Sequence, residues 1–307
     1  MDESFFCLRT RERKRLDDSH SNNGLLAARG EWESADNQVN SQSKQILILN
    51  LMPTKLTTER QFLKRFAAGT TDVTVTFMYP ASHQFKSLPQ AVIAAHYVTL
   101  ADIYDQYFDG LIVTGAPVET LPFERVDYWR ELLVIIDWAQ RHVSQTLFEC
   151  WAAQAGLYAQ FGIAKRLVAH KIFGIYRATN TDVKSPLING LSAGGLLKMP
   201  QSRHTALVMP EQLPNGLQVV ADNPQVGPLV LTAPKQHAVY VTGHPEYERQ
   251  TLADEYFRDR RKHLPIQLPE HYFATERLTT VDYSWQTASD RLYQNWLATL
   301  NLAKVGY

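Results

Sequence analysis

From residue 45 onward, short hydrophobic runs alternate with amphipathic stretches along the chain. Residues 45–51 are almost continuously apolar, which is typical of a strand that is buried on both faces. The other strands predicted in this half are residues 73–78, 108–114 and 146–148, and the helices between them are predicted to start near residues 57, 91 and 127. Strands and helices that alternate at this spacing predict an α/β fold, with a mostly parallel sheet covered by helices on both faces.

Residues 127–141 have the periodicity of an amphipathic helix. The apolar side chains predicted to face the core from this helix are Trp129, Leu132, Leu133, Ile136 and Trp138. After residue 157 the chain becomes more β-like, and the strands predicted there are residues 217–221, 228–232 and 238–243. Helices at about residues 250–262 and 287–303 follow, and the last one carries Leu292, Trp296 and Leu300 on one face.

The first 44 residues differ from the rest of the chain. They contain a run of charges at residues 9–15 and two polar segments rich in Ser, Asn and Asp at residues 17–23 and 34–43. Such a segment offers too little apolar surface to offset the loss of chain entropy on folding. The sequence therefore predicts a mobile tail over residues 1–44 and a single domain over residues 45–307.

Composition narrows the possible partners and location. The chain of 307 residues carries 31 basic and 31 acidic side chains, so its formal net charge of +0 gives no reason to expect binding to nucleic acid or to an anionic membrane. No apolar run approaches the roughly 18 residues of a membrane span, and the N-terminus lacks the order of a secretory signal. The two cysteines, Cys7 and Cys150, lie far apart, which predicts no disulfide and a reducing cytoplasm. No metal-ligand spacing occurs, and we expect no metal.

A cysteine lies at the junction of a predicted strand and a predicted helix. Cys150 follows the β-prone residues 146–148, and a helix-forming run rich in Ala, Gln and Leu comes directly after it. This order is that of a nucleophile elbow, a sharp turn that holds a side chain at the carboxyl edge of a parallel sheet. A helix N-terminus at that turn would favour the thiolate form of Cys150. The alternative is a buried cysteine that packs as a small hydrophobic side chain.

A histidine that could act as the base for this cysteine follows the last predicted strand. His244 comes after residues 238–243, and Glu246 is close enough in sequence to orient its ring. Nothing distinguishes six other histidines, which are His83, His96, His142, His170, His237 and His263. Because active sites lie at the carboxyl ends of parallel strands, Cys150, His244 and Glu246 predict a Cys-His-Glu triad. The alternative for His244 is a capping residue in a turn.

Several longer motifs occur together and in a fixed order. They are residues 50–55 (Asn-Leu-Met-Pro-Thr-Lys), 114–119 (Thr-Gly-Ala-Pro-Val-Glu), 126–129 (Val-Asp-Tyr-Trp), 150–157, 202–204 (Ser-Arg-His), 242–247 (Thr-Gly-His-Pro-Glu-Tyr) and 295–297 (Asn-Trp-Leu). Over about residues 45–300 this set resembles the homoserine O-succinyltransferase/O-acetyltransferase family. The resemblance implies a class I glutamine-amidotransferase-like fold, which agrees with the sheet predicted from the hydrophobic pattern.

The resemblance also implies roles for individual residues. Cys150 is expected to accept the acyl group, with His244 as its general base and Glu246 as the partner of the histidine. The residues expected to bind substrate are Lys171, Ser202 and Arg258. A fixed cation such as Arg258 suits the carboxylate of an amino-acid acceptor. The backbone N–H groups expected to hold the oxyanion are those of Trp151, Gly115 and Ala116.

The acyl donor can be predicted from one position in the resemblance. Where this chain has Glu119, members of the family that transfer succinyl groups have a small residue and members that transfer acetyl groups have glutamate. A succinyl group ends in a carboxylate, which a glutamate at this position would repel. Glu119 therefore predicts acetyl-CoA as the donor and substrate, with no separate cofactor.

Three departures from the family pattern bear on the acceptor. Ala152 replaces a glycine after the cysteine, Gln201 replaces a histidine, and Arg177 replaces a glutamate. We expect two of these changes to lie near the acceptor pocket, which leaves L-homoserine and L-serine as alternatives. One methylene is worth only about 1–3 kcal/mol in a pocket, so the sequence alone favours neither.

These predictions combine into a ping-pong O-acetyltransferase of methionine or cysteine biosynthesis. The enzyme is expected in the cytoplasm, as a homodimer, with acetyl-CoA and a small amino acid as its partners. The alternatives are an O-succinyltransferase that uses succinyl-CoA, a glutamine-amidotransferase-like hydrolase, and a binding module without catalytic activity that retains the fold.

Overall fold

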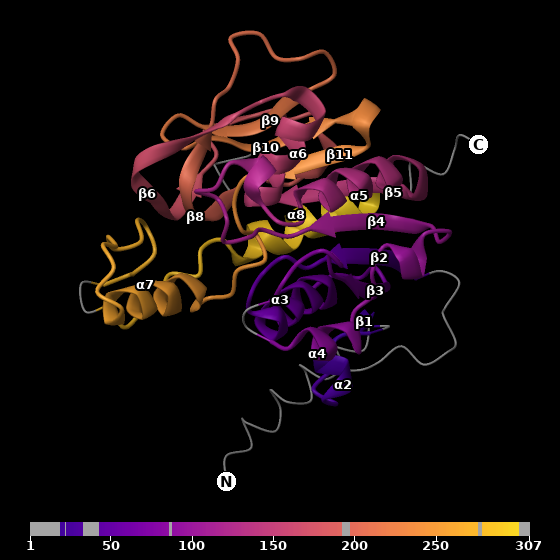
Figure 1. The fold of residues 1–307 in the computed structure, drawn as a ribbon. Coiled ribbons are helices and arrows are strands. Elements are labelled where there is room, and N and C mark those ends of the chain that lie inside the picture. The colour runs from indigo at the N-terminus through magenta and orange to yellow at the C-terminus, as the bar shows by residue number, and fades with distance from the viewer. Residues whose placement is uncertain are drawn as a thin grey trace.

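A nine-stranded sheet runs through the centre of the molecule (Figure 1), in the order β1-β3-β2-β4-β5-β11-β10-β9-β7. The structure is a computed structural model, which describes residues 19–21, 23–32, 43–85, 88–191, 197–275 and 278–300. The first six strands in this order are parallel: β1 (Ser19–Ser21), β3 (Val73–Met78), β2 (Lys44–Leu49), β4 (Phe108–Val113), β5 (Val143–Glu149) and β11 (Ala238–Val241). The predicted α/β fold with a mostly parallel sheet is confirmed.

The remaining strands are antiparallel, and three of them were not predicted. β10 (Gly227–Ala233), β9 (Gln218–Asn223) and β7 (Asn180–Thr181) extend the main sheet beyond β11. β6 (Lys165–Arg177) and β8 (Lys198–Leu207) pair with each other in a separate two-stranded sheet. The sequence pattern predicted β9 and β10 but gave no signal for β6, β7 or β8.

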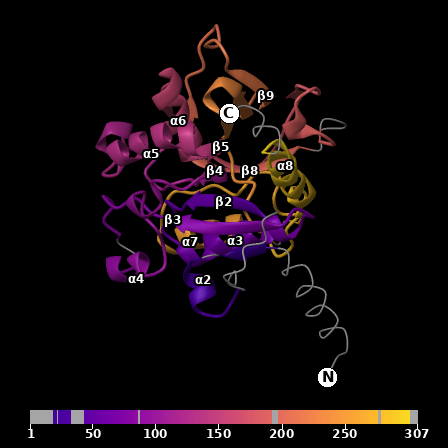
Figure 2. The same cartoon turned by 90° about the vertical axis from the view of Figure 1, so that its right-hand side faces the viewer.

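Helices cover both faces of the main sheet (Figure 2), with α5 and α6 on one side and α8 on the other. Alternate residues of β2 enter different cores, because Ile46 and Ile48 pack with α3 and α8, whereas Leu47 and Leu49 pack with α5 and α6. This double burial explains the continuous apolar run seen in the sequence. The helices are α2 (Leu25–Ala28), α3 (Lys55–Ala67), α4 (Gln90–Ala94), α5 (Trp129–His142), α6 (Trp151–Phe161), α7 (Thr251–Arg261) and α8 (Gln286–Thr299). Single 3-10 turns lie at Ala101–Ile103, Phe123–Arg125, Pro186–Ile188 and Pro234–Gln236.

The core-facing sides of α5 and α8 were largely as predicted. Leu292, Trp296 and Leu300 are all buried at the end of the chain. On α5 one assignment was wrong, because Leu133 is 39% exposed and the fully buried residue of that turn is Ile135. The helix carries more apolar residues than one face can bury.

Part of the segment predicted as a mobile tail is folded. β1 pairs with β3, and α2 buries Leu25 and Leu26. The backbone N–H groups of these two leucines donate to the carboxylate of Glu59 on α3, at 2.9 and 2.8 Å. The remainder of that segment, with Cys7 and the charge run, lies outside the described residues.

The small sheet and α7 share a third apolar cluster, separate from the cores of the main sheet. Gly174 of β6 has a φ of 145°, and a Cβ atom there would lie 2.3 Å from the carbonyl oxygen of Glu270. Only glycine allows this approach, which brings the segment after α7 against β6. Within the described ranges, every helix is too short or too polar to cross a membrane.

Candidate active site

Cys150 lies at the sharp turn between β5 and α6, as the elbow pattern predicted. Its backbone has φ 49° and ψ −113°, a conformation that residues other than glycine rarely adopt. The turn is held in place because the Cys150 N–H donates to the carbonyl oxygen of Val241 on β11, at 2.8 Å. Such strained residues are concentrated at functional sites. The side chain is 4% exposed.

His244 and Glu246 lie in the loop that follows β11. The Nδ1 atom of His244 is 2.7 Å from Oε1 of Glu246, and both side chains are buried. The His244 ring stacks on Tyr247, with 4.1 Å between the ring centroids. The carbonyl oxygen of Tyr247 accepts hydrogen bonds from Arg65 and Trp285 at 2.8 and 2.9 Å, and these contacts fix the loop.

Cys150 and His244 meet beside Gly115, at the end of β4. A methyl group on Gly115 would lie 3.1 Å from Cε1 of His244 and 3.8 Å from Sγ of Cys150. Burial alone would lower the pKa of the His244 imidazole, but the negative charges of Cys150 and Glu246 raise that pKa well above its usual value. The arrangement therefore stabilises the imidazolium form of His244 beside the sulfur of Cys150.

Backbone N–H groups are available next to the thiol. Trp151 is the first residue of α6, whose first-turn N–H groups have no partner inside the helix. Among the described residues, no hydrogen-bond acceptor is present for the N–H groups of Trp151, Gly115 or Ala116. These groups could hold the negative oxygen that develops when a thiolate attacks a carbonyl.

The three residues expected to bind substrate converge on a carboxylate that the sequence analysis did not select. Lys171 of β6 forms an ion pair with Glu255 of α7. The Ser202 hydroxyl lies 2.9 and 3.0 Å from the two carboxylate oxygens of Glu255, and an Arg258 nitrogen lies 3.7 Å from one of them. The charge of Glu255 also acts on Tyr247, which links this group to the ring of His244.

Glu119 does not belong to the group around Glu255, and its carboxylate is bound by His204 of β8. One carboxylate oxygen of Glu119 accepts from the backbone N–H of His204 at 3.0 Å and lies 2.7 Å from its Nδ1. The charges of Glu119 and Cys150 both act on Arg203, whose pKa burial lowers to about 10. Glu119 is therefore fixed in orientation and close enough to influence the charges around the cysteine.

Two of the departures from the family pattern lie on the paired strands β6 and β8. Gln201 and Ser202 are neighbours on β8 and point to opposite faces, and Gln201 is fully buried with its oxygen 2.9 Å from Nε of Arg203. Arg177 is paired with Lys198 at the far end of β6, roughly 20 Å along the strand from Lys171 at ~3.3 Å per residue. Neither residue has a hydrogen bond or ion pair with Glu255 in the described part of the chain, but Gln201 lies beside the residue that precedes His244, because a Cβ atom on Gly243 would be 2.5 Å from the Gln201 Nε2 atom. That two of the three changes lie near the acceptor pocket stays a prediction.

Glu255 and Tyr247 are the site residues that sequence reasoning missed. A signal for Glu255 was present, because it lies three residues before Arg258 and so shares a side of α7 with it. Its contacts with Lys171 and Ser202 join residues 84 and 53 positions apart. No local pattern predicts such contacts.

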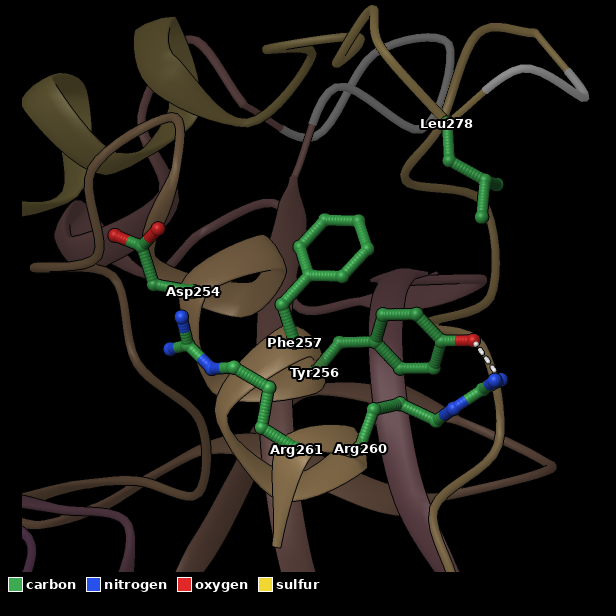
Figure 3. A pocket seen from close by; sticks show the side chains of 6 residues that line it. All are labelled: Asp254, Tyr256, Phe257, Arg260, Arg261 and Leu278. Atoms are coloured by element: carbon green, nitrogen blue, oxygen red, sulfur yellow. Dashed lines mark hydrogen bonds between the residues drawn. The ribbon is translucent and has the colours of Figure 1, made fainter. Parts of the chain in front are cut away.

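The other side of α7 borders a separate hollow (Figure 3). Its volume is about 670 Å³, and it is lined by Asp254, Tyr256, Phe257, Arg260, Arg261 and Leu278. Arg260 points toward Tyr256 and donates to its hydroxyl at 3.0 Å. The described residues that line this hollow include neither Glu255 nor its three contacts Lys171, Ser202 and Arg258, and none of them was predicted as a site residue.

Comparisons of the sequence with known proteins all match homoserine acyltransferases. A model of the homoserine O-succinyltransferase family matches residues 22–305. The homoserine O-acetyltransferase of Lactococcus lactis subsp. lactis (strain IL1403) is 41% identical over 268 residues, which are 86% of this chain and 82% of the relative. That of Streptococcus pneumoniae (strain Hungary19A-6) is 39% identical over 254 residues, covering 82% and 80%. A glutamine amidotransferase structure from Thermotoga maritima is similar in fold, with a TM-score of 0.55, 12% identity and coverage of 85% of this chain and 99% of that one.

Proposed function

The chain belongs to the homoserine O-succinyltransferase family of acyltransferases, and on that premise we propose that it acetylates an amino-acid hydroxyl through a thioester on Cys150. The observation that carries the proposal is the strained elbow at Cys150 beside the hydrogen-bonded pair of His244 and Glu246. Relatives named homoserine O-acetyltransferase support L-homoserine as the acceptor. We assign the product to methionine biosynthesis.

The first half-reaction forms an acetyl-enzyme. The Cys150 thiolate attacks the thioester carbon of acetyl-CoA, and the N–H groups of Trp151, Gly115 and Ala116 hold the resulting oxyanion. The bond to the sulfur of coenzyme A then breaks, and the leaving thiolate takes the proton from the His244 imidazolium. Glu246 keeps the imidazole oriented throughout.

The second half-reaction transfers the acetyl group to the acceptor. His244, now neutral, removes the proton from the acceptor hydroxyl, whose oxygen attacks the thioester carbon on Cys150. Collapse of the tetrahedral intermediate releases the O-acetyl amino acid and restores the thiolate and the imidazolium. A single base serves both steps because each transfer reverses the proton movement of the other.

The group around Glu255 fits a zwitterionic acceptor. Lys171 and Arg258 supply positive charge for the carboxylate of the amino acid, and Glu255 supplies negative charge for its ammonium group. Ser202 adds a hydroxyl within hydrogen-bonding distance of Glu255. In the absence of substrate these residues pair with one another, so binding exchanges internal contacts for contacts to the amino acid.

Glu119 supports acetyl-CoA over succinyl-CoA. Its carboxylate is oriented by His204 and acts electrostatically on the surroundings of Cys150. A succinyl group would bring a second carboxylate into this region, where like charges repel. The acetyl group carries no charge and avoids this penalty.

Intact-protein mass spectrometry tests the proposal directly. The enzyme is mixed with acetyl-CoA or succinyl-CoA and then chased with L-homoserine or L-serine, with Cys150→Ala as the control. We expect an acetyl adduct that requires Cys150 and is discharged by L-homoserine. Discharge by L-serine alone would reassign the acceptor, a succinyl adduct would reassign the donor, and no adduct on a folded enzyme would reject the acyltransferase mechanism.

Three further predictions from the sequence remain proposals. We propose that residues 45–307 form one acyltransferase domain, and that the packed segment at residues 23–32 belongs to the same domain. A homodimer and a cytoplasmic location are proposed on the same family basis. Gel filtration with light scattering measures the oligomeric state, and cell fractionation measures the location.

A further inference from the structure

A buried carboxyl group that the proposed mechanism does not use lies directly before the nucleophile. Glu149 is the last residue of β5 and is completely buried. Its Oε1 accepts a hydrogen bond from the Tyr293 hydroxyl of α8 at 2.6 Å, whereas its Oε2 has no partner in the described part of the chain. A buried polar atom without a partner is destabilising, because it has lost its hydrogen bonds to water and gained none in the protein. A contact that completes the hydrogen bonding of Glu149 is therefore expected.

Glu246 carries a matching unpaired oxygen. Its Oε1 is bonded to His244, but its Oε2 is buried and has no donor among the residues that the structure describes. Val241 pairs with Glu149 in the sheet, so the loop after β11 begins beside the end of β5. Besides burial, the charge of Glu246 and a hydrogen bond with Glu246 raise the pKa of the Glu149 carboxyl, which agrees with two neighbouring carboxyl groups that each carry an unpaired oxygen. One proton between them would remove the repulsion of two buried negative charges and pair both oxygens.

The surrounding charges favour Glu149 as the residue that holds this proton. Glu149 faces Glu246 and His244 from the loop after β11 and Tyr293 from α8, and Arg65 of α3 acts on Tyr293. Burial raises the pKa of the Glu149 carboxyl well above its usual value, and the negative charge of Glu246 raises it further. The hydrogen bond from Tyr293 and the charge of His244 act in the opposite direction but do not outweigh these effects. Glu246, by contrast, is bonded directly to the imidazole.

We propose that Glu149 is a positioning residue that keeps its proton and donates it in a hydrogen bond to Oε2 of Glu246. This inference rests on the proposed roles of Cys150, His244 and Glu246. The contacts form a buried chain in which Tyr293 donates to Glu149, Glu149 donates to Glu246, and Nδ1–H of His244 donates to Glu246. No proton moves along the chain during acyl transfer. Its effect is to keep Glu246 ionised and oriented toward the histidine.

Two substitutions of Glu149 separate hydrogen bonding from packing. Glu149→Leu retains apolar bulk but removes the donor to Glu246, whereas Glu149→Gln keeps a donor for Glu246 and an acceptor for Tyr293. We expect kcat to fall about 10- to 100-fold in Glu149→Leu with little change in KM. The acid limb of its kcat profile should also move to higher pH, because the ionised Glu246 loses a hydrogen-bond donor. Glu149→Gln should recover most of the rate and the wild-type acid limb.

Equal losses in both variants would overturn the proposal, as would a Leu variant with the wild-type rate and pH profile. A second measurement remains decisive if the Leu variant does not fold. The infrared difference spectrum of wild type minus Glu149→Gln, recorded at neutral pH without substrate, should contain the C=O stretch of a protonated carboxylic acid. Its absence would show that Glu149 is ionised. Because this spectrum needs no acyl donor, its outcome is independent of the proposed function, which fails instead if wild type forms no acyl adduct.

Discussion

The Ser202 hydroxyl of β8 lies between the two carboxylate oxygens of Glu255 on α7, 2.9 Å from one and 3.0 Å from the other. This contact joins the small antiparallel sheet to α7, the helix that follows the loop with His244 and Glu246. Lys171 reaches the same carboxylate from the neighbouring strand. The group presents both signs of charge within a few ångströms, which suits an amino acid that carries both.

Glu255→Gln should weaken binding of the acceptor without preventing formation of the acetyl-enzyme. The substitution keeps the size of the side chain but removes the charge that we pair with the ammonium group of the acceptor. We expect KM for the acceptor to rise about 10- to 100-fold, since a charge-assisted hydrogen bond contributes about 1.5–3 kcal/mol. The measurement is the rate of discharge of preformed acetyl-enzyme at increasing amino-acid concentration.

Ser202→Ala is the matched control for that experiment, because it removes a hydroxyl from the same group but leaves its charges in place. Its effect on KM should be smaller. If Glu255→Gln slowed acetylation of Cys150 by the same factor as discharge, both relative to wild type, the role of Glu255 would not be confined to the acceptor.

Glu119→Gln and Glu119→Ala should both increase the use of succinyl-CoA relative to acetyl-CoA. If the charge of Glu119 excludes the succinyl carboxylate, the neutral Gln variant already relieves the repulsion and the Ala variant adds space. A like-charge interaction of a few kcal/mol corresponds to a change of at least about 10-fold in the ratio of kcat/KM values. Competition between the two donors, followed by the relative amounts of acetyl and succinyl adduct on Cys150 in the mass spectrum, measures this ratio directly.

A change in the Ala variant alone would assign the discrimination to size rather than to charge. Unchanged ratios in both variants would place donor selection elsewhere in the site.

Gly115→Ala should slow both half-reactions while leaving the fold intact. The added methyl group would lie 3.1 Å from Cε1 of His244 and 3.3 Å from Cβ of Cys150, closer than ordinary packing allows. The histidine must shift by a few tenths of an ångström, which misaligns it with the thiol, and we expect kcat to fall about 10- to 100-fold. Thermal unfolding monitored by circular dichroism should be close to wild type. A large drop in the melting temperature would mean that the loss reflects unfolding instead.

The sequence predicted those parts of the site that depend on local order. A strand followed directly by a helix requires a sharp turn, so the position of Cys150 followed from a few neighbouring residues. His244 was found for the same reason, because it comes directly after a strand whose buried pattern is evident. Parallel strands then bring the two ends together at one edge of the sheet.

The parts that were missed depend on long-range packing. Residues 165–171 of β6 are mostly exposed or half-buried, so neither alternation nor a continuous apolar run reveals the strand. Without that strand the partners of Glu255 could not be placed. Leu133 was assigned to the core on its hydrophobicity, but the helix surface that faces the sheet is already filled by its neighbours, including Ile135.

The last prediction concerns Lys55, at the first turn of α3. The side chain is 2% exposed, and its ammonium group donates to the carbonyl oxygen of Asn50. Burial lowers the pKa of Lys55 to about 7 from an ordinary value of 10.5, against the opposing charge of Glu59. Between these two values the unfolded chain holds a proton that the folded protein has released. The free energy of unfolding therefore rises with pH across this window and decreases as the pH is lowered toward 7.

Lys55→Met removes this titration and retains a long apolar side chain. The stability of wild type relative to this variant should increase with pH between about 7.5 and 9.5, by up to about 1.4 kcal/mol per pH unit. Urea unfolding at the two ends of the range measures the difference, and Lys64→Met, at a half-exposed lysine of the same helix, is the matched control. The control should show a much smaller dependence. A difference between wild type and Lys55→Met that stays constant across the range would show that Lys55 remains protonated in the folded protein, with its ammonium group hydrogen-bonded to the carbonyl oxygen of Asn50.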